Sequence, residues 1–82
     1  MISVRLRLFG PLKDIARVDE ISLQVPPPYT GDSAFEVLAR TFPDLRQWRP
    51  SIRLAVNLSY VPFDTPLKGG DEIGFIPPVS GG

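Results

Sequence analysis

Apolar and polar residues alternate along several short stretches of this chain. Between residues 2 and 8 the apolar side chains fall on every second position, with serine or arginine between them. The stretches 21–25 and 52–57 repeat this alternation, which is typical of a strand that buries one face. Two more strands are predicted at 60–63, where Pro62 indicates a sheet edge or a break, and at 72–76 after a glycine-containing turn.

A different spacing predicts one main helix in the middle of the chain. Its apolar residues recur at intervals of three and four and would share one face of a helix over residues 33–42: Phe35, Leu38, Ala39 and Phe42. Ser33 and Glu36 match the capping box S-x-x-E at its start, and Pro43 is expected to end it. We interpret the aromatic residues as core packing against a sheet rather than as contacts to a cofactor.

Three other segments have weaker signals. A short helical turn is expected over residues 12–17, and residues 44–50 are ambiguous, with a helical turn that leaves Trp48 half exposed as one interpretation. The segment VPPPYTGD at 25–32 has three consecutive prolines, which interrupt regular structure. A rigid connecting loop is the favoured interpretation, and a proline-rich ligand segment is the alternative.

The order of these elements predicts an α+β fold. One helix separates two groups of strands, and this long connection lets the first and last strands pair in parallel at the centre of a mixed sheet. Antiparallel neighbours would flank that pair. This arrangement is the ubiquitin-like β-grasp with one main helix, formed by a single domain over residues 1–76 and followed by a flexible tail over 77–82.

Composition removes several classes of function. The chain has no cysteine and no histidine, so thiol nucleophiles, imidazole bases and the usual zinc ligands are missing. Nine basic and nine acidic residues cancel without forming a basic patch, which argues against a nucleic-acid partner. The alternating N-terminal stretch resembles neither a signal peptide nor a membrane span, so a cytoplasmic location is the default expectation.

The last six residues, PPVSGG, have an unusual composition. Pro77 and Pro78 restrict the backbone, and beyond Val79 the side chains shrink to those of serine and glycine, which suits a narrow slot in another protein. Gly82 would offer only its α-carboxylate, which becomes electrophilic when a partner holding ATP and Mg²⁺ adenylates it. Sulfur or an amine could then capture the acyl group. The alternatives are an inert stub or a remnant of cloning.

Residues 55–82 resemble the C-terminal third of the MoaD family, the small sulfur-carrier subunits of molybdopterin synthase. The shared features are a VN strand, a DxPLxxGDE turn and a closing FxPPVxGG, and the N-terminal strand with its LFG end resembles the family more loosely. The chain departs from the family at Lys13 and Asp14, where many relatives carry Arg-Glu, and in its proline-rich loop.

This resemblance implies a function for the tail. An E1-like, MoeB-like enzyme using ATP and Mg²⁺ would adenylate Gly82, and the product would become a thiocarboxylate. The tail would then enter the large, MoaE-like synthase subunit in a heterotetramer and donate sulfur to the pterin precursor. The chain would be the non-catalytic subunit and bind no cofactor or metal itself, so its reacting C-terminus would be its only catalytic group.

The resemblance also assigns partner contacts to the residues before Gly82. Gly81 and Ser80 would pass through the slot, while Val79, Pro78 and Pro77 would seat the tail. Phe75 and Ile76 are adjacent in the last strand and therefore point to opposite faces. We expect Phe75 to pack inward with Ile73 and Ile76 to face the partner, and Phe75 at the interface is the alternative.

Other functions share the same tail chemistry. A ubiquitin-like protein modifier passes through the same adenylate and ends in an isopeptide bond to lysine. Sulfur carriers for thiamine synthesis or tRNA thiolation also end in Gly-Gly, although the FIPPVSGG segment favours the molybdopterin branch. A binding module with an incidental Gly-Gly end is the remaining alternative, and it predicts that deletion of Gly82 leaves function unchanged.

Overall fold

The computed structural model describes residues 1–78, and its elements follow the predicted order. Its strands are β1 (Ile2–Leu8), β2 (Glu20–Val25), β3 (Arg53–Val56), β4 (Ser59–Val61) and β5 (Glu72–Ile76). Its helices are α1 (Gly10–Ala16), α2 (Gly31–Thr41) and the 3₁₀ helix η1 (Pro43–Ser51). The ambiguous stretch at 44–50 is therefore helical, with Trp48 half-buried. The division at residue 76 into a domain and a tail stays a prediction.

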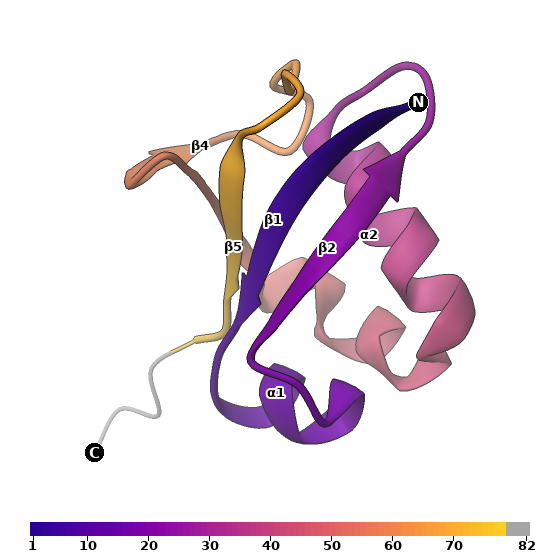
Figure 1. Ribbon diagram of the computed structural model, residues 1–82. Helices are drawn as coiled ribbons and strands as arrows, with labels where there is room; N and C mark the ends of the chain where they lie inside the picture. Colours follow the sequence, from indigo (N-terminus) through magenta and orange to yellow (C-terminus); the bar gives the residue numbers. More distant parts are fainter. Residues whose placement is uncertain (79–82) are drawn as a thin grey trace.

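The strands form one mixed sheet in the order β2-β1-β5-β3-β4 (Figure 1). β1 and β5 pair in parallel at its centre, and the other neighbours pair antiparallel. The predicted pairing of the first and last strands is confirmed, and so is the α+β, ubiquitin-like β-grasp. Pro62 directly follows β4, which is an edge strand, as its sequence indicates.

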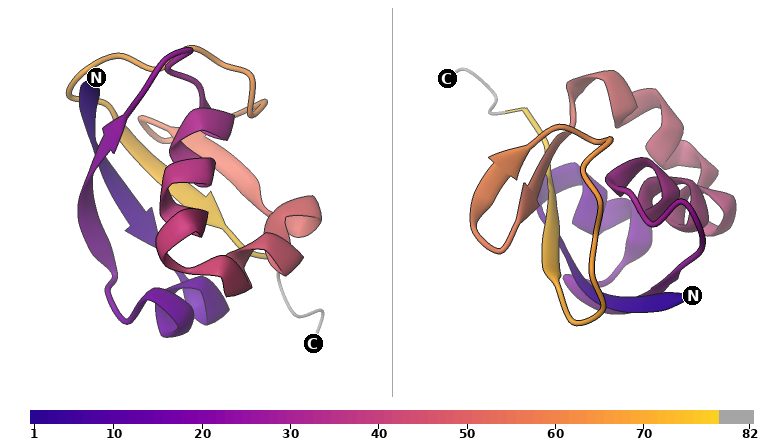
Figure 2. Two further views of the ribbon diagram at one scale, coloured as in Figure 1. Left: turned by 90° about the vertical axis from the view of Figure 1, so that its right-hand side faces the viewer. Right: turned by 90° about the horizontal axis from the view of Figure 1, so that it is seen from above.

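The hydrophobic core lies between one face of the sheet and α2, which crosses that face (Figure 2). In β1 the apolar residues after Ile2 are buried, while the serine and arginines between them are exposed. Phe35 and Leu38 of α2 are buried against this face, and Phe42 is partly buried beside them. The predicted packing of the helix against a sheet that contains the first strand is therefore confirmed.

Three phenylalanines from distant parts of the sequence meet in this core. The ring centroid of Phe75 in β5 lies 5.6 Å from that of Phe35 and 5.9 Å from that of Phe63. Phe35 and Phe63 meet edge to face at 6.5 Å. Such aromatic pairs add stability beyond that of the buried area. They connect α2, the segment after β4 and the central strand β5.

The main helix begins earlier than predicted. Thr30 has extended backbone angles and caps α2: its Oγ1 accepts a hydrogen bond from the Ser33 amide at 3.2 Å. The Ser33 hydroxyl accepts one from the Thr30 amide at 3.3 Å, which completes a reciprocal capping box. The prediction that Ser33 and Glu36 form the box is therefore wrong. Ser33 is already the third residue of the helix, because α2 starts at Gly31.

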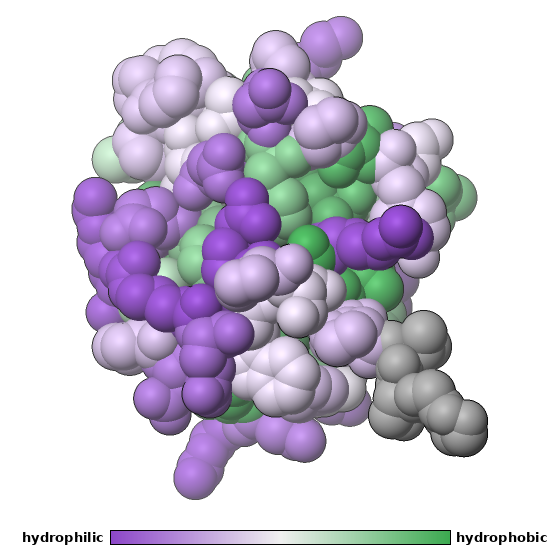
Figure 3. Space-filling model, turned by 180° about the vertical axis from the view of Figure 1, so that it is seen from behind, coloured by the Kyte–Doolittle hydropathy of each residue, from purple (hydrophilic) through white to green (hydrophobic). Residues whose placement is uncertain are grey.

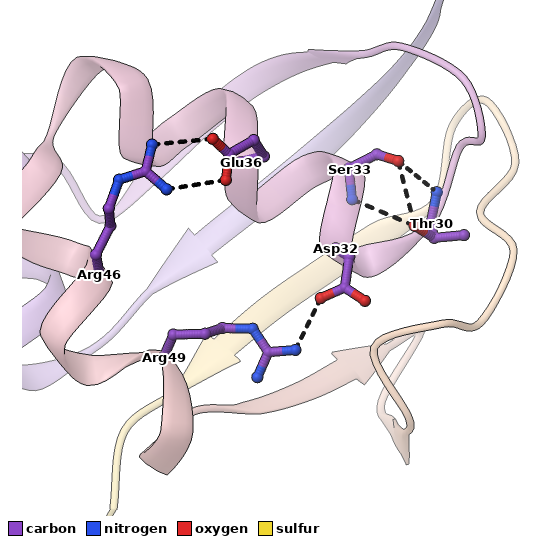
Figure 4. A network of polar contacts seen from close by, with 6 residues as sticks. All are labelled: Thr30, Asp32, Ser33, Glu36, Arg46 and Arg49. Atoms are coloured by element: carbon purple, nitrogen blue, oxygen red, sulfur yellow. Dashed lines mark hydrogen bonds and ion pairs between the residues drawn. The ribbon is translucent and has the colours of Figure 1, made fainter.

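Ion pairs connect α2 to η1 (Figure 4). Arg46 donates two hydrogen bonds of 2.9 Å to the carboxylate of Glu36, and this pairing lowers the pKa of Glu36. Arg49 donates a hydrogen bond of 2.8 Å to Asp32, and its guanidinium lies 3.5 Å from the centroid of the Phe63 ring. Glu36 therefore joins the two helices instead of capping one.

Candidate functional site at the end of strand β5

The predicted tail begins where β5 ends, beside the junction of β1 and α1. Pro77 is half-buried and Pro78 is exposed. A Cβ atom added to Gly10 would lie 3.4 Å from Cγ of Pro77, so the proline ring lies directly over this glycine. Gly10 has φ of +53°, in the left-handed region that favours glycine. This close approach holds the first tail residue against the domain.

A shallow groove starts at the two prolines and extends toward β3 and β4. Its volume is about 310 Å³, and it is lined by Ser51, Arg53, Tyr60, Ile76, Pro77 and Pro78. The guanidinium of Arg53 lies 5.3 Å from the centroid of the Tyr60 ring, which keeps both side chains on the same side of the sheet. A peptide-sized partner segment could follow this groove from the tail to the edge strand.

The sheet face opposite α2 carries an apolar surface next to this groove. The register places Arg7, Gly74, Ala55 and Tyr60 in one row across the strands. Phe9 is 40% exposed and Tyr60 is 64% exposed on the described chain. We call Phe9, Ala55, Leu58, Tyr60, Gly74 and Ile76 the open-face patch. It combines apolar groups with charged neighbours such as Arg7, which is typical of a reversible protein interface.

A tight turn at the edge of the patch presents Leu58 to solvent. Asn57 and Leu58 join β3 to β4 and have φ of 47° and 73°. Leu58 is 95% exposed. The Asn57 side chain donates a hydrogen bond of 3.1 Å to the Asp71 carboxylate and accepts one of 3.1 Å from the Glu72 amide. These bonds fasten the turn to the start of β5.

The structure brings some predicted site residues together and excludes another. Ile76, Pro77 and Pro78 line one groove at the end of β5, and their role as partner contacts stays a prediction. Phe75 is 0% exposed, so its alternative assignment as a partner-contacting residue is wrong, and its inward packing with Ile73 is confirmed. The reason is the register, which pairs Phe75 with the buried Leu8 and Leu54.

The remaining predicted site residues are Val79, Ser80, Gly81 and Gly82, which lie outside the described residues. Across residues 1–78, no group of three or more acidic side chains is arranged to hold a metal ion. In the same part of the chain, no helix has the length and apolar character to span a membrane.

Sequence reasoning missed Phe9, Leu58, Tyr60 and Gly74 as members of this surface. The sequence did contain a signal for Phe9, because this residue continues the odd-numbered positions of β1, whose side chains face away from the core. Tyr60 and Gly74 could not be placed without the cross-strand register. Leu58 lies between two predicted strands, and its exposure could not be predicted because its left-handed backbone is a property of the turn.

A larger hollow lies on the other side of the molecule, over α2 and η1. Its volume is about 720 Å³, and its lining includes Phe35, Asp32, Glu36, Arg46 and Arg49. Figure 3 shows this side, where apolar surface is visible between hydrophilic side chains. Glu36 is paired with Arg46, and Asp32 with Arg49. The hollow shares no lining residue with the groove at the tail, so we do not assign the predicted chemistry to it.

Known proteins resemble this chain in sequence and in overall fold. The sequence profile of the ThiS family matches residues 6–82, nearly the whole chain. The chain belongs to the ThiS family. The molybdopterin synthase sulfur carrier subunit of Mycobacterium tuberculosis is 32% identical to this ThiS-family chain over 85 aligned positions, and the match covers 100% of both sequences.

Solved structures give two further relatives of this ThiS-family chain. Small archaeal modifier protein 1 of Methanosarcina acetivorans has a TM-score of 0.86 and 27% identity, covering 100% of this chain and 98% of the other. Subunits 1 and 2 of the molybdopterin-converting factor of Helicobacter pylori form a complex, and the matching chain has a TM-score of 0.69 and 27% identity. That match covers 99% of this chain and 100% of the other.

Proposed function

We propose that this ThiS-family chain is the sulfur-carrier subunit of a molybdopterin synthase. The observation that carries the proposal is the end-to-end match to a molybdopterin synthase sulfur carrier subunit at 32% identity. The β-grasp domain provides a rigid base, and β5 directs the chain out of it between Gly10 and the groove. The tail sequence VSGG then offers little steric hindrance to a narrow partner site.

The proposed chemistry takes place at the α-carboxylate of Gly82. A carboxylate oxygen attacks the α-phosphorus of ATP on the activating enzyme, and pyrophosphate leaves while Mg²⁺ balances the phosphate charge. Hydrosulfide then attacks the acyl carbon, and AMP leaves with the electrons of the broken C–O bond while the hydrosulfide proton is lost to solvent. The resulting thiocarboxylate carries sulfur to the pterin precursor. This chain supplies the acyl group, and the activating enzyme supplies ATP and the metal ion.

The proposed acceptor of the tail is the large subunit of the synthase. Support comes from the relative in Helicobacter pylori, whose two subunits form a complex. The open-face patch adjoins the end of β5 through Ile76, so a partner that encloses the tail would also cover the patch. We further propose a heterotetramer, because two carriers then serve the two sulfur transfers that a dithiolene requires.

Intact-mass analysis of native protein tests this function. The thiocarboxylate predicts a mass gain equal to replacing one oxygen by sulfur, localised to the C-terminal peptide and lost on alkaline hydrolysis. Deletion of Gly82 withdraws the reacting carbon by about 3.5 Å. Misplacement by about 1 Å can already slow a reaction on the order of a hundredfold, so sulfur transfer should be lost while the fold is unchanged.

Two glycine variants refine the test. Gly81→Ala should reduce sulfur transfer more mildly than the deletion, through one added methyl group in the proposed slot. Gly69→Ala is the matched control because a Cβ atom there meets nothing within 4 Å. Unmodified carboxylate in native protein, together with full activity of the Gly82 deletion, would contradict the sulfur-carrier function.

A protein modifier is the second candidate, because small archaeal modifier protein 1 has the same fold at a TM-score of 0.86. This function predicts Gly82 in an amide bond to a lysine of another protein. Proteolysis would release a branched peptide, which the thiocarboxylate cannot produce. The same mass-spectrometry sample therefore distinguishes the two candidates.

A further inference from the structure

A small pocket lies in the middle of the open-face patch. Its volume is about 130 Å³, and its lining includes Phe9, Ala55, Leu58, Gly74 and Ile76. A dry apolar cavity of about 150 Å³ is large enough to hold benzene. The pocket is slightly smaller than that, so it has room for one branched aliphatic side chain, and its walls are largely apolar.

Gly74 creates the floor of this pocket. It occupies the centre of β5, where glycine weakens a strand because it has no side chain to pack. A Cβ atom at this position would lie 3.4 Å from Cδ1 of Ile76 and 3.5 Å from Cε2 of Phe9. The surrounding atoms therefore admit an alanine, with only a small adjustment. The fold does not require glycine here, whereas the pocket does.

Leu58 forms the outer wall of the pocket under unfavourable local conditions. It adopts φ of +73° in a two-residue turn, where glycine or asparagine is favoured, and it is 95% exposed. Its side chain thus contributes little to the core, and its backbone is strained. Both features are disadvantages for a residue whose only role is structural. A partner that covers the Leu58 side chain would account for both features.

We propose that this pocket receives one apolar side chain from the large synthase subunit, with Leu58 closing over it. This inference rests on the proposed function and identifies where the partner is anchored. The large subunit is the source of this side chain because the pocket is continuous with the groove at the base of the tail: Ile76 lines both. A subunit that encloses the tail would therefore lie next to the pocket. Arg7 and Glu72 at the rim offer charges of both signs to polar groups around the anchor.

Gly74→Ala tests the pocket directly. The added methyl group takes up space at the floor of the pocket. A partner side chain that fits the parent pocket would then be overpacked, which is unfavourable. We expect the Kd for the large subunit of the same organism, measured by isothermal titration calorimetry, to rise about tenfold. The melting temperature should stay the same or increase, since alanine is less costly than glycine in a strand. Gly69→Ala, an exposed turn variant, should change neither quantity.

Leu58 provides an independent test, because its variants should also weaken binding without lowering stability. Leu58→Gly and Leu58→Asn relieve the left-handed backbone and should preserve or raise the melting temperature. Both should increase the Kd about fivefold or more, because the outer wall is removed. A residue with only a structural role would show no change in Kd.

The possible outcomes separate this inference from the proposed function. If Gly74→Ala and Leu58→Asn are folded and bind the large subunit within twofold of the parent Kd, the anchor pocket is disproved. Thiocarboxylate on native Gly82 would in that case still support the sulfur carrier. If the parent chain does not bind the large subunit at all, both proposals fail. Sedimentation that shows the parent dimerising and Gly74→Ala monomeric would assign the pocket to a second copy and overturn the inference.

Discussion

Phe75 and Ile76 are neighbours in β5, yet they should have opposite roles in stability and in binding. Phe75 is fully buried between Leu8 and Leu54 and contacts two other phenylalanine rings. Ile76 is half-buried on the other face and lines the groove and pocket of the candidate site. Variants at these two positions therefore test the register of the central strand.

The expected losses can be worked from the packing. Truncation of a buried phenylalanine to alanine costs about 3–5 kcal/mol. At about 0.05–0.15 kcal/mol per residue, a domain of this length has a free energy of unfolding of about 4–12 kcal/mol, so Phe75→Ala could unfold it. Phe75→Leu is the more informative variant. It keeps most of the volume but loses two aromatic pairs, each worth about 0.5–1.5 kcal/mol, so we expect a loss of about 1–3 kcal/mol.

Urea denaturation followed by circular dichroism measures this loss. With an unchanged m-value, the midpoint of Phe75→Leu should fall in proportion to the lost stability. The melting temperature should decrease by roughly 4–24 °C, since about 1 kcal/mol corresponds to about 4–8 °C in a domain of this size. Ile76→Ala should lose less stability and weaken binding to the large subunit. A larger loss of stability for Ile76→Ala than for Phe75→Leu would refute the inward packing of Phe75.

Three further predictions concern α2. Thr30→Ala should lower the free energy of unfolding by about 1 kcal/mol in urea denaturation, because it removes the observed cap. Gly31→Ala should cost about 1–3 kcal/mol in the same assay, since its Cβ would lie 3.0 Å from the Phe63 carbonyl oxygen and press on Leu54. Arg46 lowers the pKa of Glu36, so this pair stabilises the fold above the ordinary glutamate pKa of about 4.3 and the benefit is lost as pH falls. Glu36→Gln should therefore show a shallower fall in melting temperature between about pH 5 and pH 3.

For each of these three predictions, a specific result would contradict it. Ser33→Ala combined with Thr30→Ala should cost little more than Thr30→Ala alone, because both residues serve one cap, and fully additive losses would contradict a shared cap. A stable Gly31→Ala would show that the helix start can move away from Phe63. An unchanged pH profile for Glu36→Gln would show that its ion pair with Arg46 does not form in solution.

Short-range patterns in the sequence were sufficient for most of the elements. The period of two along β1 and the spacing of Phe35 and Leu38 in α2 follow from backbone geometry that each segment has by itself. The parallel pairing of the first and last strands of the chain, β1 and β5, followed from the length of the connection between them. Residue type alone led only to the expectation that the Gly82 carboxylate can be activated. Its conversion to a thiocarboxylate was implied by the resemblance of residues 55–82 to the MoaD family, and both stay predictions.

Tertiary contacts decided the features that the sequence left ambiguous. Thr30 rather than Ser33 caps α2 because the amide of Asp32 bonds to the Phe63 carbonyl at 3.0 Å, which anchors the helix start to a distant segment. Alternation separated Phe75 from Ile76 but could not say which faced inward, and pairing with Leu8 and Leu54 settled it. The open-face patch likewise exists only in the folded sheet, because cross-strand register brings together side chains that are far apart along the chain.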